Sequence, residues 1–311
     1  MKHVLEIDDL TVAELSSIVE HAQLPPDQLG NPLQGQGVAC YFAKQSARTR
    51  NSTEMAVVQL GGHPVYITDA EVSLGKRESV SDVAHTLACY HRIICARVYG
   101  HEVLEEMAGL DIVPIVNLLS DAAHPLQAIA DVLTIIGEYG TVKDKVVTYM
   151  GDANNVTRSL ALAVGMLGGK VRVITPPGNK FDPVDADRIR AAGVDFEWSE
   201  RPDELLPGSD VIYGDTWISM GEEDIRESKL RAFEGFQLNE AVMAKAPSAI
   251  FMHCLPAHRG EEVTDAVLDG PQSRIWAQAA NRLHSARGVL WFLATHGDNE
   301  RWIPTASNGH S

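Results

Sequence analysis

From Gly37 onward, short apolar runs alternate with stretches of helical spacing. This is the rhythm of βαβ units, in which a helix carries the chain from one strand to the next. Strands joined in this way lie parallel, and a parallel sheet is covered by helices on both faces. The pattern therefore predicts an α/β protein with mostly parallel sheets. The expected strands are Gly37 to Phe42, Pro64 to Ile67, Arg92 to Arg97, Ile112 to Asn117, Val146 to Met150, Lys170 to Thr175, Val211 to Tyr213 and Ala249 to Met252.

The length of the chain divides this pattern into two domains, because 311 residues exceed what one hydrophobic core usually serves. A long predicted helix from Leu126 to Tyr139 ends at Gly140, a residue type typical of helix C-caps, and a second strand and helix series follows. We expect a first domain at residues 1–138 and a second at residues 139–311. The pattern from Ile275 to His296 predicts a final helix long enough to pack back across both.

Composition excludes several classes of protein. A net charge of −16 argues against a nucleic-acid-binding surface. No run approaches the roughly 18 apolar residues of a membrane span, and the first ten residues are too acidic for a signal peptide, so we expect a cytoplasmic protein. The four cysteines, Cys40, Cys89, Cys95 and Cys254, lack metal-binding spacing, and no GxGxxG follows a strand. We expect no metal and no nicotinamide cofactor.

The stretch from Ser46 to Arg50 lies where the first expected strand turns into a helix. The first N–H groups of a helix lack partners and attract anions. Ser46 and Thr49 add hydroxyl donors, while Arg48 and Arg50 add guanidinium groups that suit phosphate oxygens. We interpret the stretch as a phosphate cradle. The alternative is a set of capping hydroxyls beside solvated arginines.

Further polar residues follow the carboxyl ends of other expected strands, where open α/β sheets bind ligands. His124 and Gln127 lie three apart at a helix start, on one face and near the positive end of the helix dipole. That position predicts a lowered histidine pKa and a neutral imidazole that donates one hydrogen bond. Gln127 offers an acceptor to a planar NH2 group. A capping histidine with a polar neighbour is the alternative.

The second half contributes an acidic loop and a cysteine. The loop from Gly214 to Asp224 contains no base, so it suits a substrate amine with Asp215 as counter-ion, although a solvated acidic loop is the alternative. Asn154 and Asn155 fit either a site or a turn and helix cap. Cys254 follows a strand beside His253; we expect a lining role rather than a nucleophile, because no catalytic triad signature accompanies it. Arg97, the last residue of an expected strand, is the final candidate site residue.

Five motifs in order resemble the ornithine carbamoyltransferases within the aspartate/ornithine transcarbamylase family. They are Ser46-Ala47-Arg48-Thr49-Arg50, His124-Pro125-Leu126-Gln127, Asp215-Thr216-Trp217-Ile218-Ser219-Met220-Gly221, His253-Cys254-Leu255-Pro256-Ala257-His258-Arg259-Gly260 and Asn281-Arg282-Leu283-His284. The resemblance covers nearly the whole chain. It implies two αβα domains with parallel sheets, linked by long helices, of which the first binds carbamoyl phosphate and the second ornithine. It also implies a homotrimer and no cofactor.

The resemblance assigns roles to individual residues. It implies that phosphate is bound by Ser46, Ala47, Arg48, Thr49 and Arg97, and the carbamoyl group by His124, Gln127, Cys254, Leu255 and Arg282. Ornithine is expected at Asn155, Asp215, Ser219 and Met220. The catalytic set implied is Arg48, Arg97, His124, Gln127, Cys254 and Arg282. The expected reaction converts carbamoyl phosphate and L-ornithine into L-citrulline and phosphate.

The chain departs from the family pattern at three positions. Ala47 stands where many members have threonine, so a hydroxyl is lost while the backbone N–H stays. Ala43 replaces a glutamate, and Ser73 replaces a glutamine that reaches the neighbouring subunit's site. Other readings are a carbamoyltransferase for putrescine or N-acetylornithine, or a silent regulatory paralogue. The acidic loop disfavours aspartate as the acceptor.

Overall fold

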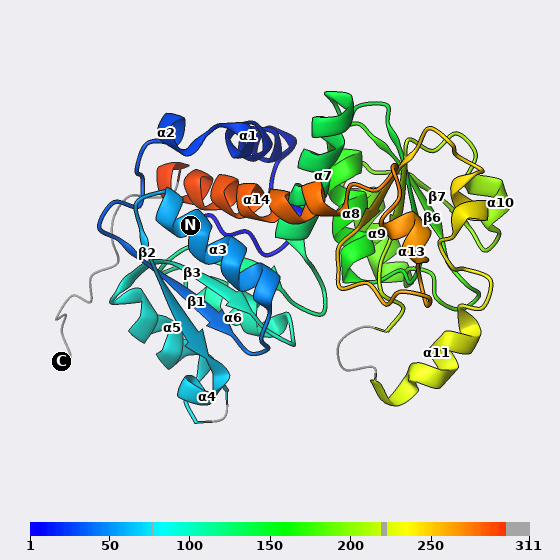
Figure 1. Ribbon diagram of the computed structural model, residues 1–311. Helices are drawn as coiled ribbons and strands as arrows, with labels where there is room; N and C mark the ends of the chain where they lie inside the picture. The colour runs from blue at the N-terminus through cyan, green and yellow to red at the C-terminus, as the bar shows by residue number, and fades with distance from the viewer. Residues whose placement is uncertain (76, 219–222, 297–311) are drawn as a thin grey trace, which may run out of the picture.

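The computed structural model describes residues 1–75, 77–218 and 223–296 and contains two parallel sheets (Figure 1). The predicted α/β class is confirmed. The first sheet has the order β2 (His63–Thr68), β1 (Gly37–Phe42), β3 (His91–Arg97) and β4 (Ile115–Leu119). The second has the order β7 (Phe196–Ser199), β6 (Lys170–Ile174), β5 (Val146–Met150), β8 (Val211–Gly214) and β9 (Ile250–His253).

Helices cover both faces of each sheet. Side chains that alternate along β1 enter two different cores: Val38 and Cys40 pack with α3 and α14, whereas Ala39 and Tyr41 pack with α5 and α6. The helices are η1 (Ile7–Asp9), α1 (Val12–Gln23), α2 (Pro26–Leu29), α3 (Ala47–Gln59), α4 (Asp69–Val72), α5 (Val80–Ala88), α6 (Glu102–Gly109), α7 (Pro125–Tyr139), α8 (Asn155–Met166), α9 (Pro183–Ala191), α10 (Pro202–Leu205), η2 (Glu223–Ile225), α11 (Arg226–Ala232), α12 (Glu240–Met243), α13 (Asp265–Leu268) and α14 (Ile275–His296). Among the helices of the described residues, none is both long enough and apolar enough to span a membrane.

Most expected strands agree with the observed ones to within one residue at each end, but two strands differ by more. The strand expected from Ile112 begins instead at Ile115, directly after Pro114, whose missing N–H removes a ladder donor. The short strand β7 was not predicted, because Phe196, Glu197, Trp198 and Ser199 form no continuous apolar run. β7 lies at the edge of its sheet, where its two central residues are exposed.

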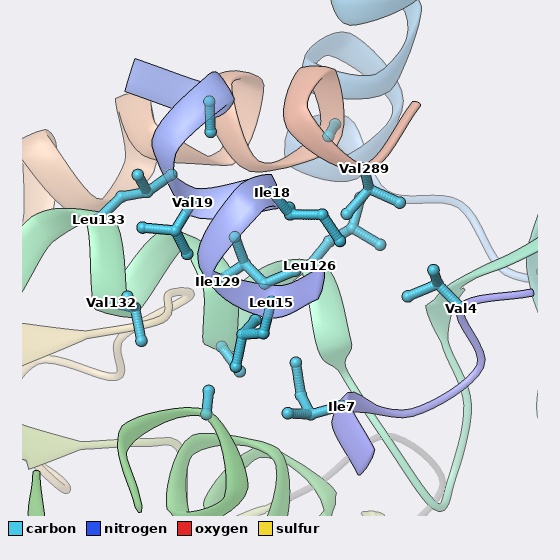
Figure 2. Close-up of a cluster of buried hydrophobic side chains, with 14 of the residues drawn as sticks. Val4, Ile7, Leu15, Ile18, Val19, Leu126, Ile129, Val132, Leu133 and Val289 are labelled. Carbon is cyan, nitrogen blue, oxygen red and sulfur yellow. The ribbon is translucent and has the colours of Figure 1, made fainter. Parts of the chain in front are cut away.

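Helix α14 joins the two halves of the molecule. It runs along α1 and α3 of the first half, packs on α7, and reaches strand β9 of the second (Figure 1). Apolar side chains from the N-terminal segment, α1, α7 and α14 gather in one cluster between these elements (Figure 2). Figure 2 labels Val4, Ile7, Leu15, Ile18, Val19, Leu126, Ile129, Val132, Leu133 and Val289. The packing fixes α14 in a position from which its first half reaches the gap between the sheets.

Charged side chains fasten the N-terminal segment to the second half. Glu6 is buried and accepts hydrogen bonds from Arg158 of α8 and from Arg188 of α9, the latter at 2.6 Å. Asp8 accepts from Arg188 Nε at 2.6 Å. Burial raises the pKa of Glu6, while the two arginines oppose that rise. These pairs hold the start of α8 against the first half of the chain.

Close packing of α14 on α1 leads to a stability prediction. A Cβ at Gly288 would lie 2.7 Å from the Ile18 carbonyl oxygen and 2.8 Å from Ala22 Cβ, both on α1. Gly288→Ala is therefore expected to lower the free energy of unfolding by about 1–3 kcal/mol. Gly137→Ala is the matched control, because that helical glycine has nothing within 4 Å and alanine should add up to about 1 kcal/mol. Urea unfolding of both variants checks this; equal midpoints would contradict the packing argument.

Candidate active site

A cleft of about 570 Å³ lies at the carboxyl ends of the strands of both sheets. Loops after β1, β3, β4, β5, β8 and β9 line it, together with α14. The cleft brings together most of the residues predicted from sequence: Ser46, Arg48, Thr49, Arg97, His124, Gln127, Asn155, Asp215, Cys254, Leu255 and Arg282. Ala47 is exposed at the first position of α3 and does not line the cleft. Ser219 and Met220 lie outside the described residues.

Donors outnumber acceptors at one end of the cleft. Ser46 caps α3, accepting from the Thr49 backbone N–H at 3.4 Å. The Thr49 hydroxyl oxygen lies within reach of three donors: Ser46 Oγ at 3.1 Å, Arg97 Nη1 at 3.4 Å and Arg282 Nη2 at 3.2 Å. A hydroxyl oxygen has two lone pairs, so it cannot satisfy all three at once. Arg282 Nε is also buried without a partner. This end of the cleft therefore suits an anion with several oxygen atoms.

Burying guanidinium groups close together at this end of the cleft is electrostatically unfavourable. Burial, together with the smaller effects of the charges of Arg282 and Arg48, lowers the pKa of Arg97 to about 10. Burial likewise lowers the pKa of Arg282 to about 10. Both side chains remain protonated at neutral pH, so like charges are confined together. An anion bound among them would offset that repulsion.

Arg50 does not belong to this cluster, contrary to the expectation that it would join the phosphate cradle. Its Nε donates to Glu54 at 2.8 Å, and its guanidinium lies 3.6 Å from the centre of the Tyr66 ring. Arg48 and Arg50 are two apart on α3, and residues so spaced do not share a helix face. Arg48 alone of this pair lines the cleft.

His124 lies at the start of α7, buried beside Arg282. Its Nε2 is 3.4 Å from Arg282 Nη1, and its Nδ1 is buried without a partner. Its side chain makes no capping hydrogen bond, which contradicts the alternative of a capping histidine. Burial, followed by the charges of Arg282 and Arg97, holds the pKa of His124 well below its usual value. The neutral imidazole was predicted, but burial is its main cause.

Gln127 lies one turn further along α7. Its Oε1 accepts from Arg282 Nη1, and its Nε2 donates to Asp131 at 2.8 Å. Sequence reasoning missed Asp131, which is fully buried. A signal was available: His124, Gln127 and Asp131 are spaced three and four apart, so all three share one helix face.

An acceptor-rich group lies across the cleft. Asp215 is buried and accepts from the Thr216 N–H at 2.7 Å, from Cys254 Sγ at 2.8 Å and from Asn154 Nδ2 at 3.0 Å. Asn154 also caps α8, which was one of the two alternatives for this residue, and it lines the cleft as well. Asn155 Nδ2 donates to the Ser120 carbonyl at 2.6 Å, across to the loop after β4. This end of the cleft suits a cation.

Cys254 acts as a hydrogen-bond donor rather than a nucleophile. Burial raises the pKa of its thiol well above the usual value, and the charge of Asp215 and the hydrogen bond to it add to the rise. A protonated thiol is a weak nucleophile. The next residue, Leu255, lines the cleft beside it, with its N–H donating to His253 Nδ1 at 3.0 Å.

Other polar residues of the cleft were not predicted. Tyr99, Asp121 and Asp152 line it, each two residues after the end of a strand. Asp185 lines it from helix α9, where a search of strand ends does not reach. Asp152 pairs with Lys229 at 2.7 Å. Among the described residues, one group has the spacing of metal ligands, namely His258, Glu261 and Glu262. It lies outside the cleft lining, and Glu261 pairs with Arg226.

Comparison with known proteins matches both halves of the chain to family models. Residues 2–137 match the carbamoyl-P binding domain of aspartate/ornithine carbamoyltransferase, and residues 143–293 match the Asp/Orn binding domain. The ornithine carbamoyltransferase of Haloquadratum walsbyi is 43% identical over 287 residues, which cover 92% of this chain and 95% of that relative.

Solved structures agree with the sequence comparison. The ornithine carbamoyltransferase of Pyrococcus furiosus is 40% identical, with a TM-score of 0.89 over 96% of this chain and 98% of that one. An N-acetyl-L-ornithine transcarbamylase is also similar in fold, with a TM-score of 0.85 over 94% of this chain and 100% of that one, but only 26% identical.

The state of Cys254 is testable by alkylation. Because its thiol is protonated and donates to Asp215, iodoacetamide at pH 7.5 is expected to modify Cys254 at least tenfold more slowly than a cysteine in an unstructured peptide. Mass spectrometry of tryptic peptides over time measures the rate. Modification as fast as the peptide, or a covalent carbamoyl adduct during turnover, would contradict the donor role.

Proposed function

Because the chain belongs to the aspartate/ornithine carbamoyltransferase family, we propose that its cleft transfers the carbamoyl group of carbamoyl phosphate to the δ-amine of L-ornithine. The products are L-citrulline and phosphate. The observation that carries the proposal is the division of one cleft into a donor-rich end around Thr49 and an acceptor-rich end around Asp215. The first end suits a phosphoryl compound and the second a cationic amino acid.

Carbamoyl phosphate binds first in this proposal. Its phosphate meets Ser46, Arg48, Thr49 and Arg97, with the backbone N–H of Ala47 at the N-terminus of α3. The carbamoyl group lies against His124, Gln127, Cys254, Leu255 and Arg282. The bound anion offsets the repulsion among the arginines and completes the surface that ornithine then contacts. Binding is therefore ordered.

Ornithine enters at the opposite end. Asp215 pairs with its α-amino group and Asn155 with its carboxylate, while Ser219, Met220 and Cys254 orient its side chain. Asp215 already holds three donors, so its carboxylate is fixed in direction before the substrate arrives. Such preorganisation lowers the entropic cost of alignment.

The reaction needs proton transfer and charge stabilisation. The neutral δ-amine attacks the carbamoyl carbon, a C–N bond forms, and the carbonyl oxygen becomes negative. Arg282, the neutral imidazole of His124 and the Thr49 hydroxyl donate to that oxygen. The C–O bond to phosphate then breaks, and the departing phosphate takes the amine's proton, with Arg48 and Arg97 stabilising its charge. This route uses no metal, cofactor or covalent enzyme intermediate.

The assembly and location belong to the same proposal. We infer a cytoplasmic homotrimer, or a multiple of trimers, as the resemblance to the family implies. Ser73 has a short side chain and lies at the end of α4 with a left-handed backbone. Because serine is shorter than glutamine, Ser73 would reach less far toward a neighbouring subunit's cleft than a glutamine would.

Two alternative functions are to be distinguished by experiment. N-acetylornithine as the acceptor is less well supported, because an N-acetyl-L-ornithine transcarbamylase is 26% identical to this chain and the ornithine carbamoyltransferase of Pyrococcus furiosus is 40% identical. Putrescine is the other acceptor to be tested. A silent regulatory paralogue is opposed by the presence of the charged and polar side chains that the reaction needs.

The phosphate end is tested by a matched pair of arginines on α3. Arg48→Ala removes a guanidinium that lines the cleft, so the affinity for carbamoyl phosphate is expected to fall at least a hundredfold. Arg50→Ala removes one that faces Glu54 and Tyr66, and its affinity is expected to stay within about threefold. Calorimetric titration measures both. Full activity of the first variant would refute the cradle.

The acceptor amine is identified by a parallel assay of citrulline-type products. With L-ornithine, putrescine, N-acetylornithine and aspartate at equal concentration, ornithine is expected to react at least a hundredfold faster. Asn155 and Asp215 recognise the carboxylate, which putrescine lacks, and the free α-amino group, which N-acetylornithine lacks; the acidic loop disfavours aspartate. The rate is expected to rise with pH as the δ-amine loses its proton. Equal or greater turnover of another amine would change the assigned substrate, and no turnover of any would favour the silent paralogue.

A further inference from the structure

A fully buried carboxylate lies behind the cleft. Asp131, on α7, accepts hydrogen bonds at Oδ1 from Gln127 Nε2 at 2.8 Å and from Gln278 Nε2 at 2.7 Å. Tyr213 donates to its Oδ2 at 3.1 Å. Gln278 in turn accepts from the His253 N–H at 2.8 Å, just before Cys254. Asp131 thus connects α7, α14 and the ends of two strands beneath the site.

We propose that Asp131 is a positioning residue that fixes the orientation of the Gln127 amide and thereby selects the NH2 group of the carbamoyl substrate. The inference rests on the proposed function. An ionised carboxylate only accepts hydrogen bonds, so Gln127 turns its NH2 toward Asp131. An arginine only donates, so the amide oxygen of Gln127 turns toward Arg282. The reversed amide would set two acceptors together on one side and two donors on the other.

The fixed orientation has a chemical consequence. Gln127 lines the cleft with its oxygen directed to the Arg282 side, so it offers an acceptor there. The NH2 group is the only hydrogen-bond donor of a carbamoyl group. An acetyl group of the same shape carries a methyl in that place and leaves the acceptor unpaired. Asp131 therefore acts on substrate choice through Gln127 without contacting the substrate.

The ionised form of Asp131 does not stabilise the folded protein. Burial raises its pKa to about 7, against the lowering effects of Gln127, Gln278, Tyr213 and Arg282. A carboxyl whose pKa is higher in the folded state than in the unfolded one stabilises the fold when protonated and loses that stability as the pH rises toward 7. Ionised Asp131 thus costs stability at neutral pH. A purely structural position would be better filled by a neutral residue of the same shape.

Two phosphonates that differ only at the selected group provide the probes. Phosphonoacetamide carries an NH2 on its carbonyl, and acetonylphosphonate carries a methyl. The measured quantity is the ratio of their affinities, obtained by calorimetric titration of the full chain at pH 8. The unmodified protein is expected to favour phosphonoacetamide by roughly tenfold or more, as expected of a site with a placed acceptor.

Asp131→Asn is the principal variant. Asparagine keeps the shape but offers both a donor and an acceptor, so Arg282 alone still opposes the reversed orientation of Gln127. The ratio is expected to fall about tenfold, with the melting temperature at pH 8 unchanged or raised. Tyr213→Phe is the matched control, because it removes one hydrogen bond from Asp131 and leaves the bond to Gln127. Its ratio is expected to stay within about twofold.

An unchanged ratio in a folded Asp131→Asn protein, or an equal fall in Tyr213→Phe, would overturn the proposal. If Asp131→Asn does not fold, the pH dependence of the unmodified protein decides. The ionisable groups around Asp131 are Tyr213 from β8, Arg282 from α14 and Cys254 after β9. The ratio is expected to fall between pH 8.5 and pH 6 as Asp131 takes up its proton; a flat ratio would overturn the proposal. Citrulline formation by the unmodified protein separates either result from a failure of the proposed function.

Discussion

The convergence of guanidinium groups on the Thr49 hydroxyl is the interaction on which the rest of the site depends. Arg97 ends a strand of the first sheet, and Arg282 arrives on α14 from the far end of the chain. Burial keeps both away from water, and the charge of Arg282 contributes to the lowered pKa of Arg97. Such an arrangement is costly in the empty protein. Its cost is offset when an anion with several oxygen atoms binds.

The fold maintains this arrangement by holding α14 rigidly. Close contact at Gly288 and the apolar cluster of Figure 2 fix α14 against α1 and α7. The ion pairs of Glu6 and Asp8 hold α8 and α9 against the N-terminal segment. With a net charge of −16, the protein repels anions overall, so the attraction is local to the cleft. Opposite ends of one cleft then recognise groups of opposite charge.

The alternation of apolar runs was enough to predict the fold class, because strand and helix periods differ in the sequence itself. The two exceptions have different causes. Pro114, a local feature of the sequence, precedes the late start of β4, whereas β7 is an exposed edge strand without an apolar run. The strand-end rule led to most cleft residues. It could not separate Arg48 from Arg50, whose difference depends on Glu54 and Tyr66. Asp131 was missed because a search of strand ends does not reach behind the cleft.

The most direct test of this account is a crystal structure with a bisubstrate analogue, a phosphonoacetyl group joined to the δ-nitrogen of ornithine. The account predicts the phosphonate at the N-terminus of α3 between Arg48 and Arg97, the amide against Gln127 and Arg282, and the amino acid at Asp215. An analogue bound in the reverse direction, or outside the cleft, would contradict it.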